Sequence, residues 1–195
     1  MTDRQRNYTA ISRAAWGSVF CRISINLGMV DILPSFVGYL LLLSSIKLLM
    51  QEEQDVALLR PFGCFLAVWS GLDWLSTALG VSPSVQFPLL GLMIALVNIY
   101  FHFQFLTNLA AFAERCGDTR MRWKGHGPPS HELRKARNWY TLLLTGLSVL
   151  VYLPQPQVDW WQYVLLVPTL GFFIVVIDIL VALFALRKLF SPETE

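Results

Sequence analysis

The sequence predicts an all-α, polytopic transmembrane bundle of about six helices, with both termini in the cytoplasm. Two long stretches are nearly free of charge: residues 74–113 contain no Asp, Glu, Lys or Arg, and residues 160–186 contain only Asp178. A transmembrane helix needs about 20 mostly apolar residues. Only 14% of the 195 residues are charged, against about 25% in an average soluble domain. Soluble helices would carry charged faces here, so the sequence favours one membrane domain over residues 1–195.

Six apolar runs define the expected helices. They cover residues 14–30, 34–50, 57–79, 87–113, 138–153 and 160–189. The first run is short and contains Arg22, Ser24 and Asn26. We expect it to cross the membrane; the alternative is a helix that lies on the surface or re-enters it. Residues 1–15 are polar and show no signal-peptide cleavage site, so insertion is expected to begin with this uncleaved helix.

Basic residues set the expected orientation, because they collect on the cytoplasmic side of membrane proteins. The connections at 80–86 and 154–159 contain no Lys or Arg, whereas both ends of the chain and the connections after the second and fourth helices are basic. This pattern predicts a cytoplasmic loop at 114–137, with a short helix at 130–136. The aromatic residues expected at the inner membrane interface are Trp16, Trp123, Trp139 and Tyr140, and those expected at the outer one are Trp74, Trp160 and Trp161.

A tight hairpin is predicted between the first two helices. Asp31 is placed to accept hydrogen bonds from the free N–H groups that open the second helix. Pro34 suits the first turn of that helix, where its missing donor costs nothing. Gly28 and Gly38 would allow the two helices to approach closely. The functional alternative is a cation or proton site at Asp31, near the outer surface.

Residues 26–39 carry the pattern Asp-Ile-Leu-Pro-x-Phe-x-Gly-Tyr, which begins at Asp31 and ends at Tyr39. This stretch resembles the signature of a group of small bacterial polytopic membrane proteins. The resemblance implies a bacterial membrane protein and carries no activity with it. Where the pattern favours an acidic residue after Pro34, this chain has Ser35, which argues against a paired-acid site.

Several polar residues fall within the expected spans and form the candidate functional or packing set. Ionisable groups are costly in hydrocarbon, so they usually face the bundle interior or water. Small or polar neighbours at helical spacing mark the same faces as helix contacts. Interhelical hydrogen bonding is one interpretation, and a substrate or proton path is the other. The candidates are Arg22, Asn26, Asp31, Asp73, Asn98, His102 and Asp178.

Arg22 and Asp178 are expected to pair inside the bundle. Each lies nine residues from a basic residue at the inner edge of its helix, which places both about 13 Å above the same interface. Opposite charges at one depth attract strongly in a low-dielectric region. The competing arrangement bonds Asp178 to His102 and leaves Arg22 with Asn26 and backbone carbonyls.

The motifs favour a non-enzymatic protein. The three cysteines are widely spaced, no metal-ligand spacing is present, and no catalytic or phosphate-binding motif occurs, so no cofactor is expected. The first functional hypothesis is a scaffold or accessory subunit of the cell membrane, the second is a small transporter or channel, and the third is an intramembrane enzyme. The expected partners are the lipid bilayer, anionic lipid at the 115–137 loop, and a second copy or another membrane protein, but not nucleic acid.

Overall fold

The protein is a bundle of six α-helices in the part of the chain that the structure describes. The computed structural model describes residues 3–22, 26–27, 30–31, 34–50, 54–80, 86–116, 127–152 and 161–191. The helices are α1 (Asp3–Arg22), α2 (Ser35–Leu49), α3 (Arg60–Ala78), α5 (Pro88–Arg115), α6 (Pro129–Tyr152) and α7 (Trp161–Leu189). A short 3-10 helix, η1 (Gln54–Leu59), precedes α3, and the two-residue strands β1 (Asn26–Leu27) and β2 (Val30–Asp31) pair antiparallel. The predicted all-α class is confirmed.

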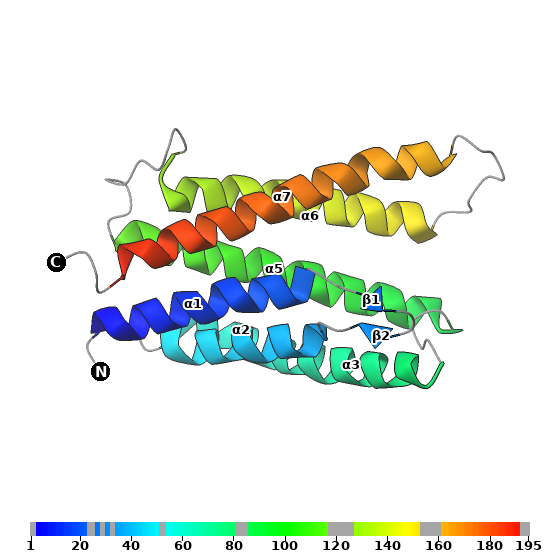
Figure 1. Ribbon diagram of the computed structural model, residues 1–195, viewed down its shortest axis with the longest axis horizontal. Coiled ribbons are helices and arrows are strands. Elements are labelled where there is room, and N and C mark those ends of the chain that lie inside the picture. Colours follow the sequence, from blue (N-terminus) through cyan, green and yellow to red (C-terminus); the bar gives the residue numbers. More distant parts are fainter. Residues whose placement is uncertain are drawn as a thin grey trace.

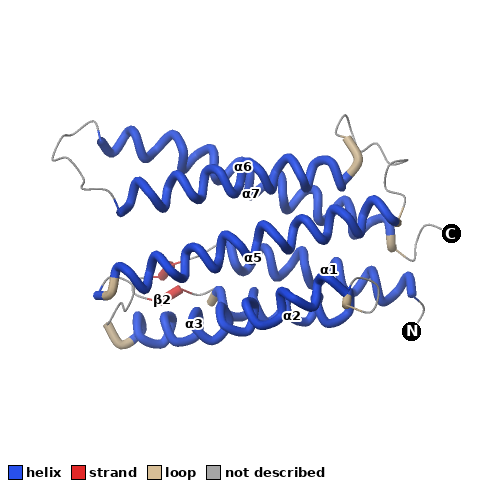
Figure 2. The backbone as a smooth tube through the Cα atoms, turned by 180° about the vertical axis from the view of Figure 1, so that it is seen from behind, coloured by secondary structure: helices blue, strands red, loops and turns tan. Residues whose placement is uncertain are grey.

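Successive helices run in opposite directions along the long axis of the molecule, so both chain ends lie at one end of the bundle (Figure 1). Each helix packs against its neighbours in sequence, and α7 packs back on α1, which closes a ring. Figure 2 shows the α6–α7 pair on one side of α5 and the α2–α3 pair on the other. The centre of this ring is where side chains from helices that are distant in sequence meet.

Three helical segments of the described chain are long and apolar enough to cross a membrane: Asp55–Ala78, Pro88–Arg115 and Leu165–Leu189. Each also presents apolar side chains outward at helical spacing, as a lipid-facing surface does. A water-exposed surface this apolar would be unusual for a soluble protein. The outward rows are Val68, Leu72, Leu75 and Leu79 on α3, Leu89, Met93 and Leu96 on α5, and Val167, Leu170, Ile174 and Ile177 on α7.

The buried core occupies the half of the bundle that holds the chain ends. The largest fully buried side chains come from five of the helices and from η1. Several polar groups there are paired, although Asn108 Nδ2 has no described partner: the Ser45 hydroxyl donates to the Ala10 carbonyl at 2.8 Å. Arg187 donates through Nε to the Tyr8 hydroxyl at 3.0 Å, which ties α7 to α1. The fully buried core side chains include Ile11, Leu42, Ile46, Leu59, Phe101, Phe105, Leu109, Leu133, Ile179, Leu183 and Leu186.

The first helix differs from the predicted span at 14–30, which is wrong in both bounds. α1 begins at Asp3, because residues Ala10, Ala14 and Ser18 form a buried stripe at helical spacing that packs on α2. It ends at Arg22, and Asn26 lies in a strand. Residues 14–22 of α1 would cover only about 13 Å of a hydrocarbon layer about 30 Å thick.

The fifth helix, α6, also corrects an expectation, because residues 114–137 are not one loop. α5 continues to Arg115, and α6 begins at Pro129 and runs unbroken to Tyr152. Proline is favoured at the first position of a helix. The predicted short helix at 130–136 is thus the first part of α6. The other predicted helices agree with α2, α3, α5 and α7 within a few residues.

The α1–α2 contact depends on two glycines. A Cβ on Gly38 would lie 2.7 Å from the Cys21 amide nitrogen and 2.8 Å from the Gly17 carbonyl oxygen. The predicted close approach at Gly38 is therefore confirmed, and Gly28 lies outside the described residues. The N-cap of α2 is Pro34 rather than Asp31, which lies in β2 three residues earlier.

Candidate functional site

A group of polar side chains meets inside the ring of helices, which we call the polar cluster. Four helices contribute to it, and its members are joined by hydrogen bonds or ring contacts. Three of the residues were candidates from the sequence. The members are Arg22 of α1, Tyr39 of α2, Asn98 and His102 of α5, and Tyr140 of α6.

Tyr39 links α2 to α5 across the centre of the ring. Its hydroxyl donates to Oδ1 of Asn98 at 3.0 Å. Its ring packs edge-on against His102, with 6.1 Å between centroids. Tyr39 is buried, so this hydrogen bond replaces the water that its hydroxyl would otherwise bind.

His102 is buried and has one ring nitrogen without a described partner. Its Nδ1 lies 3.0 Å from the carbonyl oxygen of Asn98. A carbonyl oxygen only accepts hydrogen bonds, so Nδ1 carries the proton and donates. In a neutral imidazole Nε2 is then an acceptor, and no described residue donates to it. His102 therefore presents an unfilled acceptor inside the bundle.

Arg22 places a guanidinium group against the Tyr140 ring. Its Cζ lies 4.9 Å from the ring centroid, within the range of a cation–π interaction. The Tyr140 hydroxyl also interacts with the guanidinium, in a geometry that falls short of a full hydrogen bond. All three guanidinium nitrogens are buried, and none meets hydrogen-bond geometry with a described residue. A buried cation without hydrogen-bond partners is costly, although its place in the last turn of α1 suits the helix dipole.

The polar cluster carries positive charge and no described carboxylate. The titratable side chains that interact electrostatically with Arg22 are Cys21, Tyr39, His102 and Tyr140, all uncharged in their ordinary states at neutral pH. Ser18 lies one turn before Arg22 on α1, and its buried hydroxyl also has no described partner. The cluster thus offers several unfilled donors and one unfilled acceptor.

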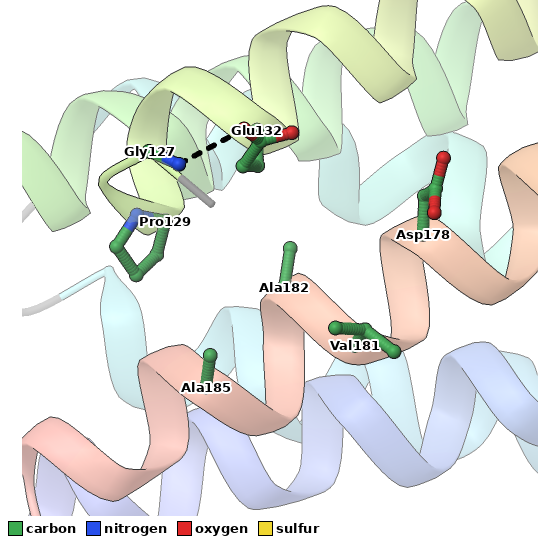
Figure 3. A pocket seen from close by; sticks show the side chains of 7 residues that line it. All are labelled: Gly127, Pro129, Glu132, Asp178, Val181, Ala182 and Ala185. Carbon is green, nitrogen blue, oxygen red and sulfur yellow. Dashed lines mark hydrogen bonds between the residues drawn. The ribbon is translucent and has the colours of Figure 1, made fainter. Parts of the chain in front are cut away.

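Asp178 is not part of the polar cluster. It lies exposed on α7, in a pocket whose other wall is the start of α6 (Figure 3). In this pocket the Gly127 amide donates to Glu132 at 3.2 Å. The predicted pairing of Arg22 with Asp178 is wrong, and so is the alternative pairing of Asp178 with His102. Distance along α7 predicts the depth of Asp178 but not the direction of its side chain, and its side of the helix faces α6.

The remaining candidates lie elsewhere. Asp73 is on α3, partly buried, and its Oδ1 has no described partner. Asn26 and Asp31 face each other in the β1–β2 pair, and their side chains lie outside the described residues. The structure therefore brings together Arg22, Asn98 and His102 and leaves Asp73 and Asp178 outside the polar cluster.

Two tyrosines of the polar cluster were missed by sequence reasoning. Tyr140 was expected at the inner interface, but it is buried against His102, with 5.8 Å between ring centroids. Its signal is the helical stripe that it forms with Leu133 and Ala136, both buried. Trp139, its neighbour, is half exposed and suits an interface.

Several basic residues at the chain-end side of the bundle have partners within the protein. Arg134 forms a salt bridge with Glu114 at 2.8 Å, which joins α6 to α5. Arg137 donates to the Thr107 hydroxyl at 2.9 Å and lies over the Phe103 ring. The residues 117–126 of the expected lipid-binding loop lie outside the described chain. Contact with anionic lipid remains a prediction.

The fold and the polar cluster define a class: a helical membrane protein with a buried cation. Within the described residues, no group of three or more His, Cys, Asp or Glu side chains is arranged to hold a metal ion. Comparison of the chain with known protein families, curated proteins and solved structures finds no match.

Proposed function

We propose that this chain is a multi-pass protein of the bacterial cell membrane that binds a small polar solute at the polar cluster, as a small transporter does. The observation that carries the proposal is the pair of unfilled groups, the Arg22 guanidinium and His102 Nε2. Ionisable side chains inside membrane bundles often mark substrate pathways. The resemblance of residues 26–39 to small bacterial membrane proteins supports the assignment to a bacterial membrane.

The positions of α1 and α2 in the bundle support the same function. Both stop part-way along the bundle, near one another, whereas α3, α5, α6 and α7 continue to the far end (Figure 1). Helices that break inside the membrane leave backbone groups for a ligand, and transporters place substrate sites at such breaks. Arg22 is the last residue of α1, so its side chain lies at such a break.

The proposed topology has both termini in the cytoplasm. The described basic residues Arg13, Lys47 and Arg187 lie at the chain-end side of the bundle, as the alternating helix directions require. α3, α5 and α7 cross the membrane, and α6 must cross to connect α5 to α7. The α1–α2 hairpin enters the membrane from the cytoplasmic side and returns to it.

A scaffold or accessory subunit is the second candidate, and the packed half of the bundle favours it. There, bonds such as Ser45 to Ala10 and Arg134 to Glu114 hold helices together without any ligand. A purely structural bundle would be expected to pair its buried polar groups in the same way. Arg22 and His102 instead have buried nitrogen atoms without a described hydrogen-bond partner. Solute binding is therefore favoured over a purely structural role.

Thermal unfolding of the purified full chain against a panel of polar metabolites, ions and lipids tests the proposal. A solute that binds only the folded state raises the melting temperature in a saturable way. We expect at least one solute to do so, and His102→Gln to abolish the rise. The matched control is His131→Gln, because His131 is exposed at the start of α6. If no solute stabilises the protein, or if the rise is kept in both His102→Gln and Arg22→Gln, the scaffold function is favoured instead.

A further inference from the structure

We infer that the solute is a small oxyanion, a carboxylate or a phosphate, held by the Arg22 guanidinium. This inference rests on the proposed function and names the chemical class of its ligand. The first argument is charge. Arg22 is a permanent cation with no described carboxylate in contact, and its three nitrogens are buried. An anion bound to the guanidinium would supply the missing negative charge and remove most of the free-energy cost of burying the Arg22 cation.

The second argument is the geometry of the guanidinium. Its five N–H bonds lie in the plane of the group, and the described acceptor that interacts with them is the Tyr140 hydroxyl, which does not meet full hydrogen-bond geometry. The contact with Tyr140 therefore orients Arg22 and leaves most of its donors free. The planar fork of donors matches the two oxygens of a carboxylate or a phosphate, which is the usual reason for arginine at such sites.

The third argument is what lies around the cation. His102 Nε2 accepts a hydrogen bond, and the Ser18 hydroxyl is an unfilled group one turn from Arg22. Hydrogen phosphate, which has both acceptor oxygens and an O–H donor, would satisfy Arg22 and His102 together. Acetate has two acceptor oxygens but no O–H donor, so it would accept hydrogen bonds from Arg22 and leave His102 Nε2 without a donor. Both anions should therefore bind, and hydrogen phosphate should bind more tightly.

The competing arrangement is internal. Arg22 closes α1, and the last carbonyl oxygens of that helix have no intrahelical donor, so they are able to accept its hydrogen bonds. In that arrangement the guanidinium donors are already bonded to backbone carbonyls and stabilise the α1–α2 hairpin, so they do not bind an anion. The two arrangements differ in one measurable property, which is the response of the folded protein to added oxyanion.

The experiment is thermal unfolding of the full chain in dodecyl maltoside, a detergent without phosphate or carboxylate. Sodium chloride is replaced stepwise by sodium phosphate or sodium acetate at constant ionic strength and pH. At about 100 times the dissociation constant we expect a saturable rise of about 5–10 °C in melting temperature, greater affinity for phosphate, and no rise with chloride. Because the detergent carries no phosphate, a lipid headgroup is not the source of the effect.

Variants locate the anion. Arg22→Gln should lose the rise, whereas Arg13→Gln should keep it, because Arg13 is an exposed cation of the same helix that donates to Ser44. If Arg22→Gln does not fold, Arg22→Lys keeps the charge and should retain a weaker response. A wild-type protein that shows no saturable response overturns the inference, and so does an Arg22→Gln protein that responds like the wild type.

Failure of this inference is distinct from failure of the proposed function. If neutral or cationic solutes stabilise the protein through His102 while phosphate and acetate do not, the oxyanion assignment is overturned and solute binding stands. If no solute of any charge stabilises the protein, both are overturned. A saturable anion response that depends on Arg22 supports both.

Discussion

Gly38 is the residue on which the close packing of α1 against α2 depends. The atoms that a Cβ would meet include the Cys21 amide nitrogen and the Gly17 carbonyl oxygen, which belong to the backbone and do not rotate away. We expect Gly38→Ala to lower the free energy of unfolding by about 1–3 kcal/mol through overpacking. Equilibrium unfolding in detergent measures the change.

Gly146 in α6 is the matched control for this substitution. No atom lies within 4 Å of a Cβ built on it, so Gly146→Ala meets open space. The alanine should raise helix stability by about 0.5–1 kcal/mol. Equal effects of the two substitutions would contradict the packing assigned to Gly38.

Tyr39 is the residue that joins α2 to α5 at the polar cluster. Removing its hydroxyl in Tyr39→Phe leaves Oδ1 of Asn98 without its donor. We expect a loss of about 1–2 kcal/mol in the free energy of unfolding. Tyr100→Phe is the control, because Tyr100 is half exposed on α5 and should change stability by less than about 0.5 kcal/mol. A neutral Tyr39→Phe would show that the hydrogen bond contributes nothing.

For single residues, the sequence predicted which polar side chains lie inside the bundle better than it predicted the residues that they contact. Arg22, Asn98 and His102 stand out because polar groups are costly in hydrocarbon, and that cost does not depend on the fold. Their partners depend on how each helix is rotated. Asp178 was predicted to lie at the same depth as Arg22, but its side chain faces α6. Tyr140 was predicted to lie at the membrane interface, but its side chain is buried inside the bundle. Sequence distance gives depth along a helix and only a relative direction around it.

Among the elements, α6 joins a polar segment to an apolar one in a single helix. Leu133, Ala136 and Tyr140 are buried on one side of it, while Lys135 is exposed. The sequence favoured a loop followed by a short helix, because residues 114–137 are polar and contain two prolines. Buried contacts with α5 and the salt bridge from Arg134 to Glu114 stabilise the helix despite that polarity.

A proline at Lys135 tests whether α6 is continuous. Lys135→Pro removes a backbone hydrogen bond inside the helix and should cost about 3 kcal/mol or more. Lys135→Ala keeps the helix and should change the free energy of unfolding by less than about 0.5 kcal/mol. Chemical denaturation of both variants measures the difference. A proline variant as stable as the alanine variant would mean that residues 129–138 do not belong to the helix.

The α1 element was the least predictable from the sequence. Its first half is polar, so hydrophobicity favoured a start near residue 14. In the structure that half is helical because it docks on α2 and α7, where Arg187 donates to Tyr8. Docking between the two ends of a chain leaves no local pattern in either. The apolar elements α3, α5 and α7 were predictable because their length and composition alone are sufficient to cross a membrane.

For the whole molecule, the closed ring of alternating helices places the start of α1, the end of α5, the start of α6 and the end of α7 at one end. The end of α3, the start of α5, the end of α6 and the start of α7 lie at the other. The alternation follows from short connections, which the sequence shows, whereas the contact of α7 with α1 that closes the ring does not. The proposed solute site has meaning only if this ring lies across a membrane with its two ends in different compartments.

Cysteine accessibility at the two ends of the bundle tests that claim most directly. Cys116 is exposed where α5 ends, at the chain-end side, and Gln86 is exposed just before α5 begins, at the opposite side. The measurement is labelling with a membrane-impermeant thiol reagent in intact and in opened cells. A Cys116→Ser protein accounts for any reaction of Cys21 and Cys64, and it is the background for Gln86→Cys.

The account predicts that Cys116 is labelled only after the cells are opened. The Gln86→Cys variant in the Cys116→Ser background should be labelled in intact cells, because its thiol lies at the outer end of α5. Labelling of Cys116 from outside, with protection of the Gln86→Cys thiol, would reverse the orientation. Identical labelling of both positions would contradict a bundle that spans the membrane.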